Sequence, residues 1–142
     1  MKIVLDSNVL LVALGKRSRY RPIWDAFVNG AYQLIISEEI INEYEEILQG
    51  YSAPGVANLV MNLLEESPDV IYQRISYNWK AIPLDPDDDK FFDTAVAGNA
   101  DYLVTNDGHF KTVKTLEFPK VNIINTEHFL ILLNNLFPNG FE

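Results

Sequence analysis

The chain contains short runs of apolar and often β-branched residues, and each run ends at polar or turn-forming residues. Runs of this length and composition predict strands. We expect five strands, at residues 3–5, 32–36, 70–75, 102–105 and 121–124. Between them, apolar residues recur every three or four positions, the spacing of a helix with one buried face. The predicted helices cover residues 22–28, 38–48, 54–66, 91–96 and a last segment that Thr126 caps and that runs through Leu136.

Residues that commonly begin and end helices flank these segments, among them Ser37 at one start and Gly50 and Gly98 at two ends. Strands that alternate with helices predict right-handed crossovers and a mainly parallel sheet covered on both faces. The expected fold class is α/β, with three layers arranged as an α/β/α sandwich.

Length and composition fit one domain. At 142 residues and 48% hydrophobic, the chain can bury a substantial core. We expect a single domain over residues 1–137 and a loosely held tail over residues 138–142. No apolar stretch approaches the roughly 18–20 residues of a membrane helix, and no signal-like segment opens the chain, so we expect a cytoplasmic protein without a membrane anchor. The absence of cysteine excludes disulfides and thiolate zinc sites.

The net charge of −9 argues against non-specific DNA binding over the whole surface, which draws on many Lys and Arg contacts with phosphate. Acidity does not exclude RNA. Carboxylates that converge in one pocket can bind divalent cations, and those cations can then hold the scissile phosphate.

Acidic residues follow two predicted strands. Asp6 comes directly after residues 3–5, and Asp107 follows residues 102–105 in a turn-like Asn106-Asp107-Gly108. Ligands of open α/β sheets bind beyond the carboxyl ends of the strands, where both acids are expected. A cap or a turn would explain either residue equally well.

Other acids lie on predicted helices. At about 100° per residue, Glu43 and Glu45 fall on opposite borders of the apolar stripe of the Ser37 helix, so geometry does not choose between them. Residues 87–89 are all aspartate, more acids than one helix cap requires. Asp89 and Asp93 lie four residues apart on one face, where like charges repel unless a cation is near.

Four segments together resemble the motif series of PIN-domain proteins, in order and in spacing. They are Ile3-Val4-Leu5-Asp6-Ser7-Asn8-Val9-Leu10, Ser37-x5-Glu43-Tyr44, Asp85-Pro86-Asp87-Asp88-Asp89-Lys90-Phe91 and Ala100-Asp101-Tyr102-Leu103-Val104-Thr105-Asn106-Asp107. The similarity is greatest to a bacterial subfamily described as toxins of toxin–antitoxin pairs, and it covers nearly the whole chain.

The resemblance implies a PIN-like parallel sheet and a ribonuclease that cuts single-stranded RNA with one or two Mg²⁺ or Mn²⁺ ions. It selects four acids as the catalytic and metal-binding set: Asp6, Glu43, Asp89 and Asp107. Asn8 and Thr105 match positions from which family members hydrogen-bond the carboxylates, and Asp93 would act through water. Such ions can activate the attacking water and stabilise the phosphate and the departing oxygen.

A basic run follows Asp6 in the sequence. We consider Lys16, Arg17, Arg19 and Arg21 as possible RNA contacts, with Tyr20 and Trp24 beside them. The alternative is a solvated loop with Trp24 in the core. His109 and His128 are assigned no role.

The resemblance also implies partners: a small antitoxin that covers the acidic pocket, and a second copy in a homodimer. The main alternative function is a non-catalytic PIN module that binds RNA or a protein. Asp6-Ser7-Asn8 also resembles the opening of a haloacid-dehalogenase phosphatase, but that family expects a second Asp where Asn8 stands.

Overall fold

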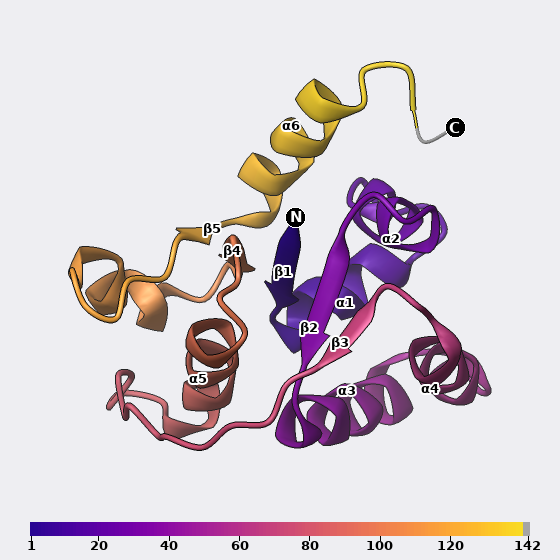
Figure 1. The fold of residues 1–142 in the computed structure, drawn as a ribbon. Helices are drawn as coiled ribbons and strands as arrows, with labels where there is room; N and C mark the ends of the chain where they lie inside the picture. Colours follow the sequence, from indigo (N-terminus) through magenta and orange to yellow (C-terminus); the bar gives the residue numbers. More distant parts are fainter. Residues whose placement is uncertain (141–142) are drawn as a thin grey trace.

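In the computed structural model, which describes residues 1–140, five parallel strands form one central sheet (Figure 1). Their order across the sheet is β3-β2-β1-β4-β5. The strands are β1 (Lys2–Leu5), β2 (Gln33–Ile36), β3 (Val70–Tyr72), β4 (Tyr102–Val104) and β5 (Ile123–Ile124). All five predicted strands are present, with β3 and β5 shorter than predicted.

Six α-helices and two 3₁₀ segments connect and follow the strands. They are α1 (Ser7–Leu14), α2 (Arg21–Val28), α3 (Glu38–Tyr51), α4 (Val56–Glu66), η1 (Pro86–Asp88), α5 (Asp89–Ala97), η2 (Gly108–Thr115) and α6 (Thr126–Leu136). Ser37 caps α3 as predicted, accepting a hydrogen bond from the Ile40 amide. The predicted cap at Thr126 is wrong by one residue, because the Asn125 side chain accepts from the His128 amide and Thr126 is already helical.

The helices cover both faces of the sheet, which confirms the three-layer α/β/α fold. Successive crossovers move from β1 to β2 and β3 through α1–α4, and the chain then returns to β4 through α5. Since parallel crossovers are right-handed, a reversal of direction moves the helix to the opposite face. Figure 1 shows α5 on the side of the sheet opposite α1, and α5 contacts β1, β2 and β4.

The three central strands, β2, β1 and β4, are buried beyond their first residues, as a parallel sheet with two covered faces requires. Residues 3–5 and 34–36 are at most 1% exposed. The end of α5 lies close to β2: a Cβ on Gly98 would fall 2.9 Å from the Ile35 side chain. Among residues 1–140, no helix is both long and apolar enough to cross a membrane. Residues 138–140 follow α6, and the remainder of the predicted tail, residues 141–142, lies outside the described residues.

The sheet order places the carboxyl ends of β1 and β4 side by side at its centre. The chain leaves β1 toward β2 and leaves β4 toward β5, so its path diverges here. Such a switch point opens a crevice in which α/β proteins bind ligands. Asp6 and Asp107 follow these two strands.

Candidate metal centre

Asp6 is a buried acid at the end of β1 and caps α1. Its carboxylate accepts hydrogen bonds from the Thr105 hydroxyl at 2.7 Å and from the Asn8 amide at 3.3 Å. Burial raises the pKa of Asp6; the two hydrogen bonds oppose this effect, and the nearby charges of Glu43 and Asp107 add to it. The two alternatives considered for Asp6, a cap and a member of a pocket, are therefore compatible.

Thr105 connects the ends of β1 and β4. Its hydroxyl donates to Asp6 and accepts a hydrogen bond from the Asp107 amide at 3.0 Å. Asp107 then caps η2, accepting from the His109 amide at 2.8 Å. One buried hydroxyl thus fixes the position of one acid and the backbone of the other.

Asp88 is the third acid at this edge. It ends η1, is 8% exposed, and its Oδ2 is buried without a hydrogen-bond partner. Burial raises the pKa of Asp88 to about 8, with further contributions from a hydrogen bond with Asp107 and from the charges of Asp107, Asp85 and Asp6. An orphaned buried carboxylate oxygen among other acids is a site of unfavourable free energy that a cation would relieve.

Asp88 belongs to a group of four converging side chains, Asp85, Asp88, Asp107 and His109. One potential ligand atom from each lies within 4.8 Å of all the others. The Nδ1 atom of His109 lies 3.2 Å from Asp107, 3.6 Å from Asp85 and 3.7 Å from Asp88. Three carboxylates and an imidazole form a donor set that suits a divalent cation.

Glu43 reaches the same edge from α3. Its carboxylate accepts a hydrogen bond from the Ser7 hydroxyl and forms a 2.9 Å ion pair with Lys90. The adjacent Tyr44 is fully buried and donates its hydroxyl proton to the Leu5 carbonyl, which ties α3 to the end of β1. Glu43 is therefore held next to Asp6 by contacts with α1 and α5.

Asp89 and Asp93 lie in a different environment. The Asp89 carboxylate accepts from the Ile82 amide and that of Asp93 from the Trp79 amide, both at 3.0 Å. Burial raises the pKa of Asp93, the Trp79 hydrogen bond lowers it, and the charges of Asp89 and Glu39 raise it further. Backbone amides of the preceding segment thus stabilise this pair, and the structure does not bring Asp89 into the group around Asp88.

The other candidates from the sequence are Asn8 and the basic run at residues 16–21. Asn8 contacts Asp6 through its backbone amide, and its side chain is exposed. In the basic run, Arg19 pairs with Glu127 of α6, while Arg21 pairs with Asp25 and caps the end of α1. Eight residues of α1 separate Asp6 from this run, about 12 Å along the helix axis.

Trp24 is 7% exposed and lies in the core, as the alternative for the basic run anticipated. Arg19 contacts α6, and Arg21 contacts α2. Among residues 1–140, neither arginine forms a hydrogen bond or an ion pair with the acidic group. The run is near Asp6 in sequence, but the structure does not bring the two together.

Sequence reasoning did not select Asp88, Asp85, His109 or Lys90, which the structure places in or beside the candidate metal-binding group. Residues 87–89 are all aspartate, so the sequence does not show which of them faces the crevice. A shift of one residue turns a side chain by about 100° around a helix. Pro86 was the available signal: it begins a 3₁₀ turn, so that Asp88 ends this turn and Asp89 opens α5.

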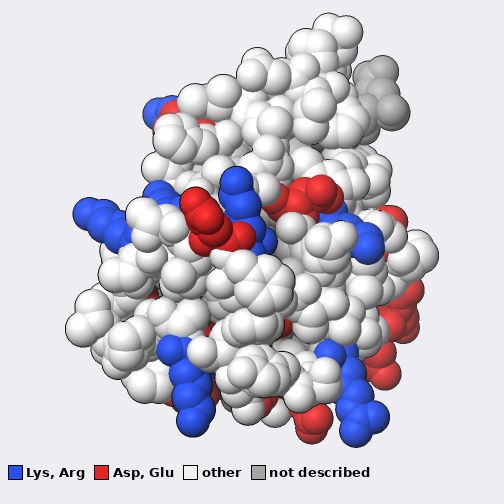
Figure 2. Space-filling view, turned by 60° about the vertical axis from the view of Figure 1, so that its left-hand side comes forward, with Lys and Arg blue, Asp and Glu red and all other residues white. Residues whose placement is uncertain are grey.

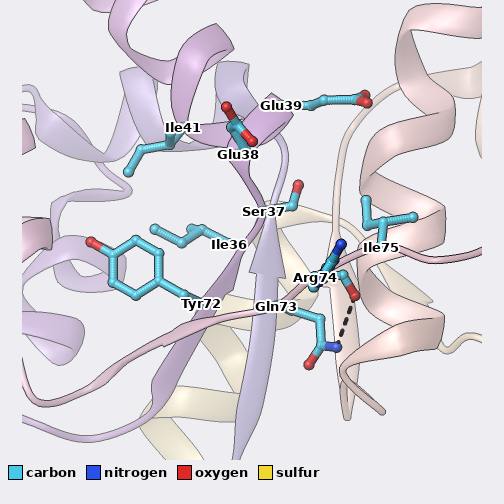
Figure 3. A pocket seen from close by; sticks show the side chains of 9 residues that line it. All are labelled: Ile36, Ser37, Glu38, Glu39, Ile41, Tyr72, Gln73, Arg74 and Ile75. Carbon is cyan, nitrogen blue, oxygen red and sulfur yellow. Dashed lines mark hydrogen bonds between the residues drawn. The ribbon is translucent and has the colours of Figure 1, made fainter.

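A cavity of about 650 Å³ lies elsewhere, at the carboxyl ends of β2 and β3 (Figure 3). Ser37, Glu39, Tyr72 and Arg74 are among the residues that line it. The cavity includes none of the four side chains around Asp88. We therefore locate the site from converging ligand atoms and not from cavity size.

Comparison with known proteins identifies the family of the chain. No curated protein shows significant similarity to the chain. A family model described as PIN domain matches residues 2–109, a range that begins at β1 and ends at His109. The match spans about three quarters of the chain and includes Asp6, Glu43, Asp85, Asp88 and Asp107, and the chain therefore belongs to the PIN-domain family.

Proposed function

We propose that this protein is a metal-dependent endoribonuclease that hydrolyses single-stranded RNA at the crevice between β1 and β4. The observation that carries the proposal is the convergence of Asp85, Asp88, Asp107 and His109, in which the buried Oδ2 of Asp88 accepts no hydrogen bond and lies 3.7 Å from His109 Nδ1. PIN domains are generally nucleases, and the family match extends through this site. RNA as the substrate rests on the resemblance of the motifs.

The side chains have distinct roles in this proposal. Asp85, Asp88 and Asp107 would provide carboxylate oxygens for a divalent ion, with Asp6 as a further acid at the same edge, and Thr105 keeps Asp6 and the Asp107 backbone in place. When bound, such an ion supplies charge stabilisation at the phosphate and lowers the pKa of an attacking water. Asp88 replaces Asp89 as the third acid of the proposed set.

Glu43 completes the set from the side of α3. Ser7 and Lys90 already neutralise and orient its carboxylate without an ion. Lys90 is only 12% exposed at its side chain, so the pair is shielded from solvent. We propose that Lys90 positions Glu43 beside the ions.

His109 favours Mn²⁺ over Mg²⁺ in this proposal. Imidazole nitrogen is a good ligand for transition-metal ions, whereas Mg²⁺ prefers oxygen ligands and water. The 3.2 Å approach of His109 Nδ1 to Asp107 lets both side chains share one ion.

The toxin role, the antitoxin and the homodimer remain proposals that rest on the resemblance alone. An antitoxin would cover the acidic crevice with Arg or Lys side chains that pair with the carboxylates.

A second candidate is a non-catalytic PIN module that binds RNA or a protein. Two observations favour it: Lys90 already pairs with Glu43, and His109, when protonated, can neutralise part of the charge around Asp88. In this case the acidic group would be stable without an ion, and the protein would bind RNA or a protein without cleaving RNA.

A cleavage assay separates the two candidates. We would incubate single-stranded RNA with the wild type, Asp88→Asn and Asp89→Asn in Mn²⁺, Mg²⁺ or EDTA. The nuclease proposal expects metal-dependent cleavage that falls about 100-fold or more in Asp88→Asn, because an ion ligand is lost. Asp89→Asn is the matched control, since its amide oxygen can still accept from Ile82, and it should cut like the wild type. RNA binding without cleavage under every condition would favour the binding module.

A further inference from the structure

Three aromatic rings form a row on the surface beside α5. The Tyr77 and Trp79 ring centroids lie 4.6 Å apart, and those of Trp79 and Phe118 lie 5.8 Å apart, in edge-to-face arrangements. Tyr77 is 63% exposed and Phe118 is 80% exposed. Exposed rings of this size are costly to leave in water unless they have a partner.

Two segments carry this row, residues 73–84 and residues 108–121, and we call their surface the aromatic–lysine face. Together the segments contain one acidic residue, Glu117, and five exposed basic side chains: Arg74, Lys80, Lys111, Lys114 and Lys120. The whole chain has 11 Lys and Arg against 20 acids, so this face reverses the charge balance of the molecule. Figure 2 shows the molecule from this side, with blue side chains spread over a mostly white surface and red acidic side chains beside some of them.

The aromatic–lysine face adjoins the metal centre through the chain itself. Residues 73–84 lead directly into Asp85, and residues 108–121 follow Asp107 and include His109. The Trp79 amide is bound to Asp93 on α5, which anchors the row to a helix of the core. This contact also gives the buried Asp93 a structural role.

We propose that the aromatic–lysine face binds single-stranded RNA and leads it to the acidic crevice. Unpaired bases stack on aromatic side chains, and lysines spaced around them bind the phosphates. A duplex hides its bases and would leave the rings without partners. The RNA identity of the occupant rests on the proposed nuclease function, but binding itself needs no metal and no cleavage.

The test is binding of a labelled, mixed-sequence RNA of about 12 nucleotides in EDTA, within the site sizes of single-strand binders. Tyr77→Ala/Phe118→Ala should weaken binding about 10-fold or more, because each lost stacking contact costs up to about 100-fold in affinity. Tyr51→Ala, which removes a ring 75% exposed on α3, should bind like the wild type. All three aromatic side chains are exposed, so the variants should fold.

Charge is tested with matched pairs. Lys114→Gln/Lys120→Gln should reduce the slope of log affinity against log salt by about 1.4, at about 0.7 per phosphate contact. Lys16→Gln/Arg17→Gln removes the same charge from exposed residues of the α1–α2 connection and should leave the slope unchanged. RNA should also quench Trp79 fluorescence, and Trp79→Phe should abolish that quenching, whereas the buried Trp24 should not respond.

The outcomes separate this proposal from the nuclease proposal. Equal RNA affinity in all variants would overturn RNA binding at this face even if cleavage proves metal-dependent. Weaker RNA binding in the face variants would support it even if the wild type cuts nothing. If Tyr77→Ala/Phe118→Ala leaves RNA affinity intact and instead dissociates a dimer in sedimentation, the face is an interface between two copies and the proposal is wrong.

Discussion

At the scale of single residues, Asp88 is the clearest case of a side chain that destabilises the fold but suits the proposed function. Its buried Oδ2 lacks a hydrogen-bond partner, and its carboxyl group lies among three other acids. Such a group costs folding free energy when it is ionised. A bound cation would remove this unfavourable free energy, and the gain would contribute to the affinity of the protein for the cation.

Asp88→Asn should stabilise the metal-free protein at pH 8 and above. The folded pKa of about 8 lies above the ordinary 3.8, so the folded state binds a proton that the unfolded state releases between these values. Stability is therefore lost as pH rises from about 4 to about 8. Asparagine keeps the volume and removes the charge, and we expect a gain of about 1–3 kcal/mol at pH 8 in urea denaturation with EDTA. An equal loss of stability would contradict the burial of an ionised group.

Tyr44→Phe should destabilise the protein by about 1 kcal/mol, because the buried Leu5 carbonyl loses its donor. Metal affinity should fall as well, since this hydrogen bond fixes α3, and with it Glu43, beside β1. Urea denaturation and metal titration measure the two effects. Tyr51→Phe, on the exposed face of the same helix, should change neither.

At the scale of elements, the strands and long helices could be predicted because apolar periodicity and caps such as Ser37 are local signals. The sequence left open whether a loop or a helix follows Asp6, and α1 begins there directly. Our proposal of Asp88 in place of Asp89 depends on η1, a 3₁₀ turn whose length the local pattern does not specify. The ion pair between Lys90 and Glu43 joins residues 47 positions apart, so only tertiary packing shows it.

The packing of α5 on β2 predicts opposite effects for two Gly→Ala substitutions. In Gly98→Ala the new Cβ would lie 2.9 Å from the Ile35 side chain and 3.2 Å from the Thr94 carbonyl oxygen. We expect a loss of about 1–3 kcal/mol from this overpacking. Gly50→Ala, in α3 with open space around its Cβ, should gain about 0.5–1 kcal/mol from helix propensity. Thermal denaturation of both variants checks the pair, and equal effects would contradict the close approach of α5.

At the scale of the whole molecule, the acidic site and a large share of the basic side chains lie in different parts of the protein. The sheet places the acids at the junction of β1 and β4, while residues 73–84 and 108–121 hold five of the 11 Lys and Arg side chains. The sequence offered the basic run after α1 as possible RNA contacts, with a solvated loop as the alternative. That run makes no hydrogen bond or ion pair with the acids among residues 1–140, whereas the segments of the aromatic–lysine face are continuous in the chain with Asp85 and Asp107 and include His109.

Metal should stabilise the folded protein, because an ion that binds the folded state alone shifts the unfolding equilibrium. At Mn²⁺ concentrations about 100 times the dissociation constant, the gain should be about 2.7 kcal/mol. Thermal denaturation with and without EDTA measures it. The gain should disappear in Asp88→Asn and persist in His128→Gln, a control at the exposed second histidine on α6.

Calorimetric titration of Mn²⁺ into the wild type, Asp88→Asn and Asp89→Asn tests the central claim most directly. The claim is that a metal centre forms around Asp88 at the junction of β1 and β4. It predicts binding to the wild type, equal binding to Asp89→Asn, and loss of most affinity in Asp88→Asn. Wild-type affinity in Asp88→Asn, or its loss in Asp89→Asn alone, would contradict the claim and place the ion elsewhere.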